Sequence, residues 1–400
     1  MNKISNRPMT EFLTSARDIF PYTQELRRDF HRHPELGFQE SRTAQVITRE
    51  LKKLDHLELK TGIAETGISA FLEGDPSGPV ILLRFDMDAL PIQEENEEEY
   101  ASENKGVMHA CGHDGHMAIG LSAARLLHDQ REHLSGSVKF IFQPAEEGLG
   151  GAQRMIQEGI LVDPAPDIVL ALHLWNEKPL GWFGISDGPM MAASEIFQVR
   201  IVGKGGHGAN PHEAIDPILA ASQIVTNMQS IVSRELSPLE PGVISVGSIH
   251  GGSAHNVIPS EVQLEGTIRT FNPQTREYVL ERFEEIVSGI AESHGCWSEI
   301  KIEKLSPAIS NDPEIAGKVR SVVSRLFPDA RLDQTYRTMT SEDMALMMEE
   351  YKSCYLLVGS ANKALGLDAK HHHPRFDFDE RALIQGTAVI TTAALSLLDR

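Results

Sequence analysis

The chain has 400 residues, 41% of them hydrophobic and 24% charged, and 37 Lys and Arg against 57 Asp and Glu give a formal net charge of −20. This composition excludes fibrous and disordered chains, and the length allows two domains with separate cores. The negative charge argues against nucleic acid and anionic lipid as partners, because both would be repelled.

The N-terminal segment lacks the apolar core of a signal peptide, and no later segment reaches the roughly 18 uncharged apolar residues that span a bilayer. The three cysteines, Cys111, Cys296 and Cys354, are odd in number and far apart, unlike a disulfide framework. We therefore expect a cytoplasmic protein with reduced thiols and no membrane partner. The acidic run at residues 94–99 favours a solvated loop.

The first 190 residues alternate between helical patterns and short apolar runs. The runs show almost no polar alternation, which is typical of strands buried on both faces of a sheet. This rhythm predicts an α/β layered domain with a mostly parallel sheet. The predicted helices cover residues 16–30, 41–54 and 116–127, and the predicted strands cover 80–85, 138–142 and 168–172.

The pattern changes at about residue 192 to the order βαββαβ, which favours a separate ferredoxin-like α+β domain. After about residue 307 the layered pattern resumes, with a helix at 313–326, a strand at 354–358 and a last helix at 379–398. We therefore predict a catalytic domain formed by 1–191 and 307–400, with 192–306 inserted into it.

Metal-binding residue types follow the predicted strands at the sheet edge where open parallel sheets carry their functional groups. Asp86 and Asp88 follow the first run, Glu146 and Glu147 follow the second in the segment QPAEE, and His173 follows the third. Because Glu146 and Glu147 are adjacent in an irregular turn, they can point in different directions, one to a metal and one to a water.

Two further segments carry candidate ligands. Cys111 and His113 stand two apart among glycines, so both can face one ion in extended chain, and one histidine of 371–373 can close the site before the last helix. Taken singly, Cys111, His173 and Glu147 also fit a buried thiol, a core histidine and a surface acid. Together, one Cys, three His and one Glu suit two divalent ions with places left for water.

Neighbouring polar residues keep alternative interpretations. Asp114 either caps the helix that follows or supports His113. His109 and His116 favour local packing or hydrogen bonding over metal binding.

Six motifs in register carry a family resemblance, which extends from about residue 31 to 380. The chain resembles the amidohydrolase branch of the aminoacylase/carboxypeptidase-like metallopeptidases, which includes hippurate hydrolases, N-acyl-amino-acid deacylases, N-acetyl-diaminopimelate deacetylases and plant hydrolases of auxin conjugates. The motifs are RFDMDALPIQEE, MHACGHDGH, QPAEEG, GKGGHGANPHEAIDP, GGSAHNVIP and HHHPRFDFDE.

The resemblance implies roles for the catalytic domain. Glu146 would be the general base, and Asp86 would support the ligands, while Arg84 stands where related carboxypeptidases have a ligand histidine. The thiolate of Cys111 would bridge both metals, and the terminal ligand would be the histidine two residues before the proline. The implied metal ligands are Cys111, His113, Glu147, His173 and His372.

The same resemblance makes the inserted domain a lid and dimerisation domain, and it implies a homodimer or homotetramer. His207 and Asn256 would reach toward the substrate, and one way for them to do so is across an interface between two copies of the chain. Arg269 would pair with a substrate carboxylate. The alternatives are turn chemistry between glycines for His207 and Asn256, and a surface charge on a strand for Arg269.

The expected function is metal-dependent hydrolysis of the amide bond of N-acyl amino acids, whose acyl group is acetyl, benzoyl or longer. The expected cofactors are two divalent ions, manganese or zinc, with cobalt or nickel also permitted by a thiolate ligand. A dipeptidase or aminopeptidase is the first rival, but no motif marks a site for a free α-amino group. A non-catalytic binding relative is the second, and the presence of Glu146 together with all five ligand types argues against it.

Overall fold

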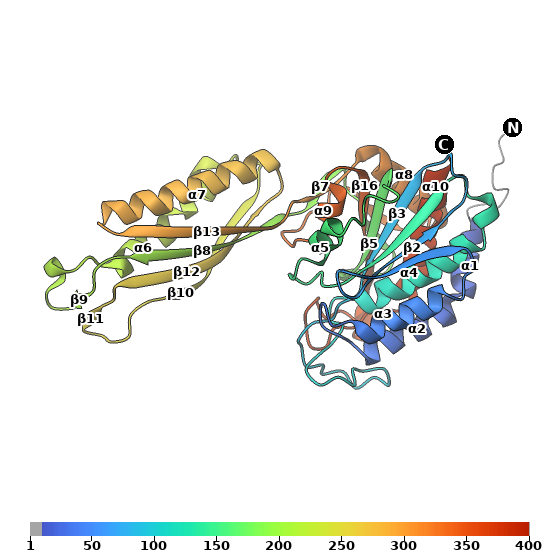
Figure 1. Cartoon of the computed structure of the whole chain (residues 1–400), viewed down its shortest axis with the longest axis horizontal. Coiled ribbons are helices and arrows are strands. Elements are labelled where there is room, and N and C mark those ends of the chain that lie inside the picture. Colours follow the sequence, from blue (N-terminus) through green and yellow to red (C-terminus); the bar gives the residue numbers. More distant parts are fainter. Residues whose placement is uncertain (1–9, 400) are drawn as a thin grey trace. The chain divides into compact units, whose positions relative to one another are not determined.

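A computed structural model describes residues 10–399 of the chain (Figure 1). It divides into two compact units. The larger unit comprises the described parts of Met1–Gly188, Ser310–Tyr336 and Asp343–Arg400, and the smaller unit comprises Pro189–Ile309 and Arg337–Glu342.

The smaller unit therefore begins at 189 and its first segment ends at 309, where the sequence suggested 192 and 306. The prediction also assigned residues 337–342 to the catalytic domain, and this is wrong. The backbone N–H of Thr338 donates to Met190 O at 3.0 Å, and the N–H of Ala192 donates to Thr340 O at 3.0 Å. These hydrogen bonds join the short segment to the start of the smaller unit.

A mixed sheet with a parallel centre organises the larger unit, as the sequence predicted. Within the described residues it has eight strands in the order β1-β2-β4-β3-β5-β16-β6-β15. β4, β3, β5 and β16 are mutually parallel neighbours, and these are the four runs that the sequence indicated. The bounds are β1 Leu57–Ile63, β2 Gly67–Leu72, β3 Val80–Asp86, β4 Ser137–Gln143, β5 Ile168–Pro179, β6 Trp182–Gly184, β15 Arg331–Asp333 and β16 Lys352–Ala361, and a two-stranded sheet pairs β7 Gly188–Met191 with β14 Ile309–Asn311.

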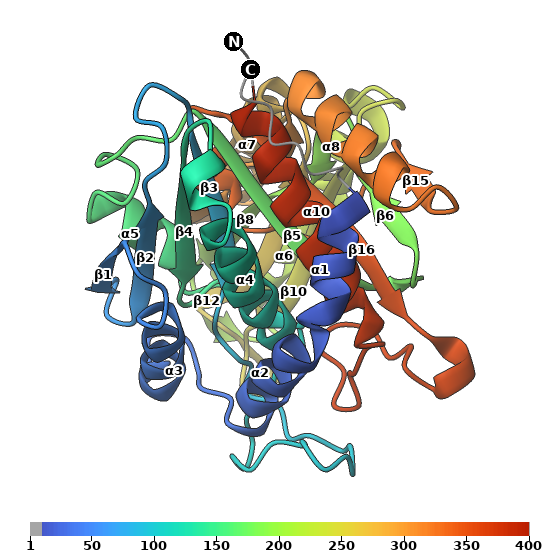
Figure 2. The same cartoon turned by 90° about the vertical axis from the view of Figure 1, so that its right-hand side faces the viewer.

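Helices of the larger unit cover this sheet, and Figure 2 shows α1, α2, α4 and α10 in front of its strands. The single helix expected over 16–30 is instead two helices, α1 and α2, which meet at Ile19. The bounds are α1 Thr10–Asp18, α2 Phe20–Arg32, α3 Ser41–Leu51, α4 His113–His128, α5 Gly151–Gln157, α8 Pro313–Leu326, α9 Ala345–Met348 and α10 Arg381–Leu398, with 3₁₀ turns at Arg131–His133 and Lys363–Leu365.

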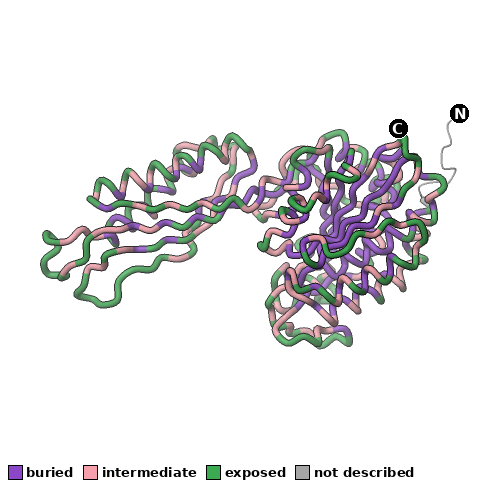
Figure 3. Tube along the Cα trace, in the orientation of Figure 1, coloured by how far each residue is buried: buried purple, intermediate pink, exposed green. Residues whose placement is uncertain are grey.

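The central strands are buried along their length, as Figure 3 shows in purple. The last helix, α10, has the length and the apolar composition of a helix that can cross a membrane. The sequence patterns did not indicate such a segment. However, 72% of it is buried inside the protein, and its apolar side chains belong to the same core as those of α4 and α8. It therefore serves the larger unit as a core helix.

The smaller unit has the ferredoxin-like order that the sequence predicted. Its antiparallel sheet has the strand order β10-β12-β8-β13, and α6 and α7 pack on one face over a separate apolar core. The first helix of this unit, α6, ends at Asn227, and a π-helical turn follows at Ile231–Glu235. The bounds are β8 Ala193–Val202, β9 Gly206–His207, α6 Pro217–Asn227, β10 Gly242–His250, β11 Val257–Ile258, β12 Glu261–Thr270, α7 Pro273–Ser293 and β13 Trp297–Ser306, with short turns at Pro211–Glu213 and Ile231–Glu235.

Candidate dinuclear metal site

The five candidate ligands of the larger unit converge at one edge of the parallel sheet. Donor atoms of Cys111, His113 and His173 lie within 4.8 Å of one another, and so do those of Cys111, Glu147 and His372. Cys111 belongs to both groups, so the arrangement provides two adjacent donor sets that share a sulfur. Glu146 joins His113 and Glu147 in a third set at the same spacing.

Gly112 determines how Cys111 and His113 face the same point. The sequence reading expected extended chain here, but Gly112 has a φ of +92° and His113 is already the first residue of α4. A left-handed residue between them turns the chain sharply, which an L side chain would resist. The shared orientation thus comes from a turn at a helix start.

His173 does not follow its strand, as the sequence reading assumed, but lies within it. β5 continues to Pro179, and His173 pairs in register with Leu357 of β16. Its Nδ1 lies 2.7 Å from Leu174 O and its Nε2 lies 3.5 Å from Cys111 Sγ. Donation from Nδ1 leaves the Nε2 lone pair directed at the shared sulfur and available to a metal.

His113 is held in the same way by Asp88, which the sequence placed among the metal-binding residue types at the sheet edge. Its Nδ1 lies 2.9 Å from Asp88 O and 3.2 Å from Asp88 Oδ1. The opposite carboxylate oxygen of Asp88 accepts the backbone N–H of Glu147 at 3.0 Å. Asp88 therefore orients two candidate ligands at once, as supporting carboxylates do in metal sites.

A buried ligand atom supports the presence of a metal. His113 Nε2 is buried and has no hydrogen-bond partner among residues 10–399. It lies 4.0 Å from Glu147 Oε1, which lies 3.3 Å from His372 Nε2. A buried polar atom without a partner is costly, and a cation bound to such an atom removes that cost. Thiolate, imidazole and carboxylate together are donors that suit zinc, manganese, cobalt or nickel. The residues present therefore fit divalent metal.

The pKa shifts of Cys111 and His113 also indicate that this cluster suits cations. Burial, together with the charges of Glu147 and Glu146, raises the pKa of the Cys111 thiol well above its ordinary value. Burial opposes charge on His113, but the carboxylates of Asp86 and Asp88 raise its pKa to about 10. Both shifts favour the protonated forms of Cys111 and His113, and bound cations would replace these protons, since a coordinating thiol is deprotonated.

Asp86 and His116 form a supporting pair. His116 Nδ1 lies 2.6 Å from Asp86 Oδ1, and His116 Nε2 accepts the backbone N–H of Leu174 at 2.9 Å. Both ring nitrogens are thus engaged, in agreement with the hydrogen-bonding role that the sequence favoured. Arg84 donates to Asp86 Oδ2 at 2.6 Å, so a buried guanidinium stands beside this carboxylate.

The three consecutive histidines differ in their surroundings. His371 Nε2 lies 2.9 Å from Leu174 O, and His373 Nδ1 accepts the backbone N–H of Arg375. His372 Nε2 lies 3.3 Å from Glu147 Oε1. The backbone geometry thus turns only the middle histidine of the three toward Glu147.

Glu146 and Glu147 follow β4 in a turn that begins at Ala145, which has a left-handed φ of +54°. Glu40, a buried residue that the sequence analysis overlooked, accepts the backbone N–H of Ala145 at 2.9 Å and the hydroxyl of Thr66 at 2.6 Å. Burial raises the pKa of Glu40 to about 7.

We expect Glu40→Ala to lower both stability and turnover. The substitution leaves the buried N–H of Ala145 and the hydroxyl of Thr66 without an acceptor, at a cost of about 1–3 kcal/mol for each. The turn that carries Glu146 then relaxes. Urea unfolding and kcat measure the two effects, with Glu58→Ala on the exposed face of β1 as control. Wild-type kcat in a folded Glu40→Ala protein would contradict this role.

The structure does not bring the three predicted substrate-binding residues of the smaller unit together. His207 and Asn256 lie on neighbouring segments, where Gly208 N–H donates to Asn256 O at 2.8 Å, and both are exposed. Arg269 lies at the other end of β12, paired in register with Ser194. The eight-residue separation along β12 from Glu261 to Arg269 spans about 27 Å. One small ligand cannot contact both ends within one chain.

The fold and the site together define a hydrolase with a parallel α/β sheet, an inserted ferredoxin-like unit and a two-metal donor set. Residues 82–396 match peptidase family M20/M25/M40. The N-acyl-L-amino acid amidohydrolase of Geobacillus stearothermophilus is 48% identical over 305 residues, which cover 75% of this chain and 82% of that protein. The chain belongs to this family, in its amidohydrolase branch, and is an amidohydrolase.

Two other relatives span nearly the whole chain. The N-acetylcysteine deacetylase of Bacillus subtilis (strain 168) is 37% identical and covers 94% of this chain and 96% of its own. The crystal structure of the Bacillus subtilis YXEP protein, described as a dinuclear metal binding peptidase from the M20 family, has a TM-score of 0.84 at 33% identity. It covers 96% of this chain and 99% of its own. This likeness confirms the predicted fold class.

Proposed function

We propose that this amidohydrolase cleaves the amide bond of N-acyl amino acids, giving a carboxylic acid and a free amino acid. The observation that carries the proposal is the pair Glu146 and Glu147 in one turn beside the shared sulfur of Cys111. The named activities of the similar Geobacillus and Bacillus proteins support the substrate class.

Cys111, His113, Glu147, His173 and His372 would hold two divalent ions in this proposal. When bound, such ions polarise the amide carbonyl and lower the pKa of water toward neutrality. Glu146 accepts a proton from the attacking water and later donates it to the departing nitrogen. His113 and His173 keep their Nε2 atoms directed into the site because their Nδ1 atoms are engaged with Asp88 and Leu174.

Arg269 is the proposed partner of the substrate carboxylate. Its guanidinium donates to the hydroxyls of Thr267 at 3.0 Å and Ser341 at 2.6 Å, and it forms no ion pair within residues 10–399. A half-buried cation that is held by neutral hydroxyl acceptors is suited to an incoming anion. Because His207 and Asn256 lie at the opposite end of β12, a second copy would have to supply them to the same substrate.

The substrate class is tested by comparing N-acetyl, N-benzoyl and long-chain N-acyl amino acids with dipeptides of matched side chains. We expect kcat/KM for the best N-acyl amino acid to exceed that for dipeptides by about 100-fold or more. A substrate that leaves polar groups of the site without partners loses about this much in kcat/KM. Amidation of the substrate carboxylate should raise KM. Preference for dipeptides would favour a peptidase, and binding without turnover of any substrate would favour a non-catalytic relative.

A further inference from the structure

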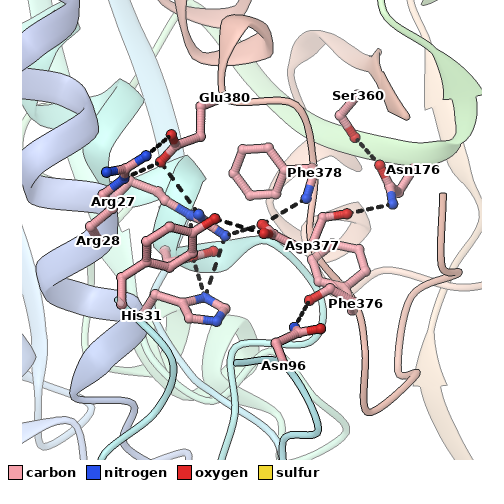
Figure 4. Close-up of polar contacts among 12 residues, drawn as sticks. Arg27, Arg28, His31, Asn96, Asn176, Ser360, Phe376, Asp377, Phe378 and Glu380 are labelled. Atoms are coloured by element: carbon pink, nitrogen blue, oxygen red, sulfur yellow. Dashed lines mark hydrogen bonds and ion pairs between the residues drawn. The ribbon is translucent and has the colours of Figure 1, made fainter. Parts of the chain in front are cut away.

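A fully buried arginine in α2, Arg27, connects two segments that carry candidate ligands. Its Nε donates to Asp114 Oδ2 at 2.8 Å and its Nη2 donates to Asp377 Oδ1 at 2.7 Å. A third, longer contact of 3.4 Å joins its Nη1 to Glu380. Figure 4 shows Arg27 between the helix α2 and the segment that contains Asp377 and Glu380.

The two near partners of Arg27 adjoin metal ligands. Asp114 follows His113 in the first turn of α4. Its side chain does not cap that helix, contrary to one of the two sequence interpretations, and instead accepts from Arg27. Asp377 lies five residues after His372 in the same loop. One guanidinium therefore links, through the carboxylates of Asp114 and Asp377, the two chain segments that carry His113 and His372.

The loop that presents His372 has no regular structure of its own. Residues 368–379 contain no helix or strand, and His372 has a left-handed φ of +65°. A non-glycine residue in this region costs about 1–2 kcal/mol. Such a conformation persists only where surrounding contacts impose it.

The N–H of His372 itself donates to Ala110 O at 2.8 Å, and contacts around Asp377 add to that support. Tyr100 donates its hydroxyl to Asp377 Oδ2 at 2.7 Å, and Asn176 donates to the carbonyl of Asp377 at 2.9 Å. Asn96 donates to the carbonyl of Phe376 at 3.1 Å (Figure 4). Among these contacts, only that of Arg27 carries a full positive charge and reaches both ligand-bearing segments.

The surroundings of Arg27 exclude water from its ion pairs. Its guanidinium carbon lies 4.7 Å from the ring centre of Tyr100 and 4.4 Å from that of Phe378. His31 contacts Asp114 at 2.7 Å and Glu94 at 3.1 Å. The side chain of Glu94 is therefore buried, whereas the other acids of the predicted solvated loop are exposed. Removing one partner of such a buried network leaves uncompensated charge and disturbs the segments that carry it.

We propose that Arg27 is a positioning residue that holds His372 in place relative to His113, and that it thereby retains the metal ion bound by Cys111, Glu147 and His372. This inference rests on the proposed metal site. His113 is anchored in a buried helix and by Asp88, whereas the side chain of His372 is 53% exposed. Loss of Arg27 therefore releases His372 first, and the donor set that contains it loses its ion.

Arg27→Gln provides the test, and Arg28→Gln is the matched control. Arg28 lies next on the same helix, its side chain is 38% exposed, and its ion pair is with Glu380. Each protein is dialysed at a fixed low concentration of free Zn²⁺ and analysed for metal per chain, and a chromophoric chelator then measures the affinity of each site. Wild type and Arg28→Gln should bind two ions.

Arg27→Gln should bind one ion per chain, with the second site weakened by about 10–100-fold, the usual effect of removing a residue that supports a ligand. The proposal would be overturned if folded Arg27→Gln bound two metal ions with the affinity of wild type and differed from it only in a lower melting temperature. If Arg27→Gln does not fold, Asp377→Asn is measured in the same way with the same criterion. Wild-type protein that binds no ion would instead refute the proposed metal site.

Discussion

Replacing Glu146 with Gln is expected to lower kcat by about 100- to 10,000-fold, the contribution typical of a general acid–base group. The amide is close in size to the carboxylate but cannot accept the proton of the attacking water. Glu147 and the shared sulfur of Cys111 are unchanged by the substitution. Both metal ions should therefore remain bound, so that catalysis and metal binding separate.

Steady-state hydrolysis of an N-acetyl amino acid and elemental analysis of the same preparation measure these two quantities. Glu132→Gln, at an exposed site in a short turn, is the control for the chemical change itself. Turnover at the wild-type rate would remove Glu146 from the mechanism. Loss of both turnover and metal would instead make Glu146 a ligand.

Replacing Cys111 with Ala is expected to remove both metal ions, whereas replacing His372 with Ala is expected to remove one. Cys111 belongs to both donor sets, and His372 belongs to only one of them. A thiolate is also the strongest soft donor in the cluster. Hydrolysis should fall below about 1% of the wild-type rate in both variants, since neither retains a complete two-metal site.

Metal content at fixed free metal, measured beside circular dichroism, distinguishes these outcomes from unfolding. Cys296→Ala removes a buried thiol from the core of the smaller unit and serves as the control for loss of a thiol. If Cys111→Ala retained two ions with wild-type affinity, the shared-sulfur arrangement would be wrong.

The sequence predicted the centre of the fold well because buried parallel strands leave an unambiguous pattern. Uninterrupted apolar runs marked β3, β4, β5 and β16, which are neighbours in the sheet. The peripheral strands β1 and β2 were missed. β1 is largely exposed, so its residues show neither an apolar run nor a clear alternation.

The candidate ligands were recognisable by residue type, but their geometry was not. His173 was expected beyond the end of its strand and lies inside it, since β5 extends well past its apolar run. Cys111 and His113 were expected in extended chain and lie around a left-handed Gly112. Neither local pattern encodes where a strand ends or which glycine adopts a positive φ.

The supporting residues were the least predictable part of the site. Arg27 stands in an amphipathic helix beside another arginine, a pattern typical of a solvated face, yet it is fully buried. Its partners Asp114 and Asp377 lie 87 and 350 positions away along the chain. Such long-range ion pairs depend on tertiary packing, which leaves no local signal in one sequence.

The central claim is tested most directly by titrating metal-free protein with Zn²⁺ or Mn²⁺ while following hydrolysis of an N-acyl amino acid. The proposed site predicts negligible activity without metal and a rise that saturates at two ions per chain. Full activity in the metal-free protein, or none after two ions have bound, would contradict it.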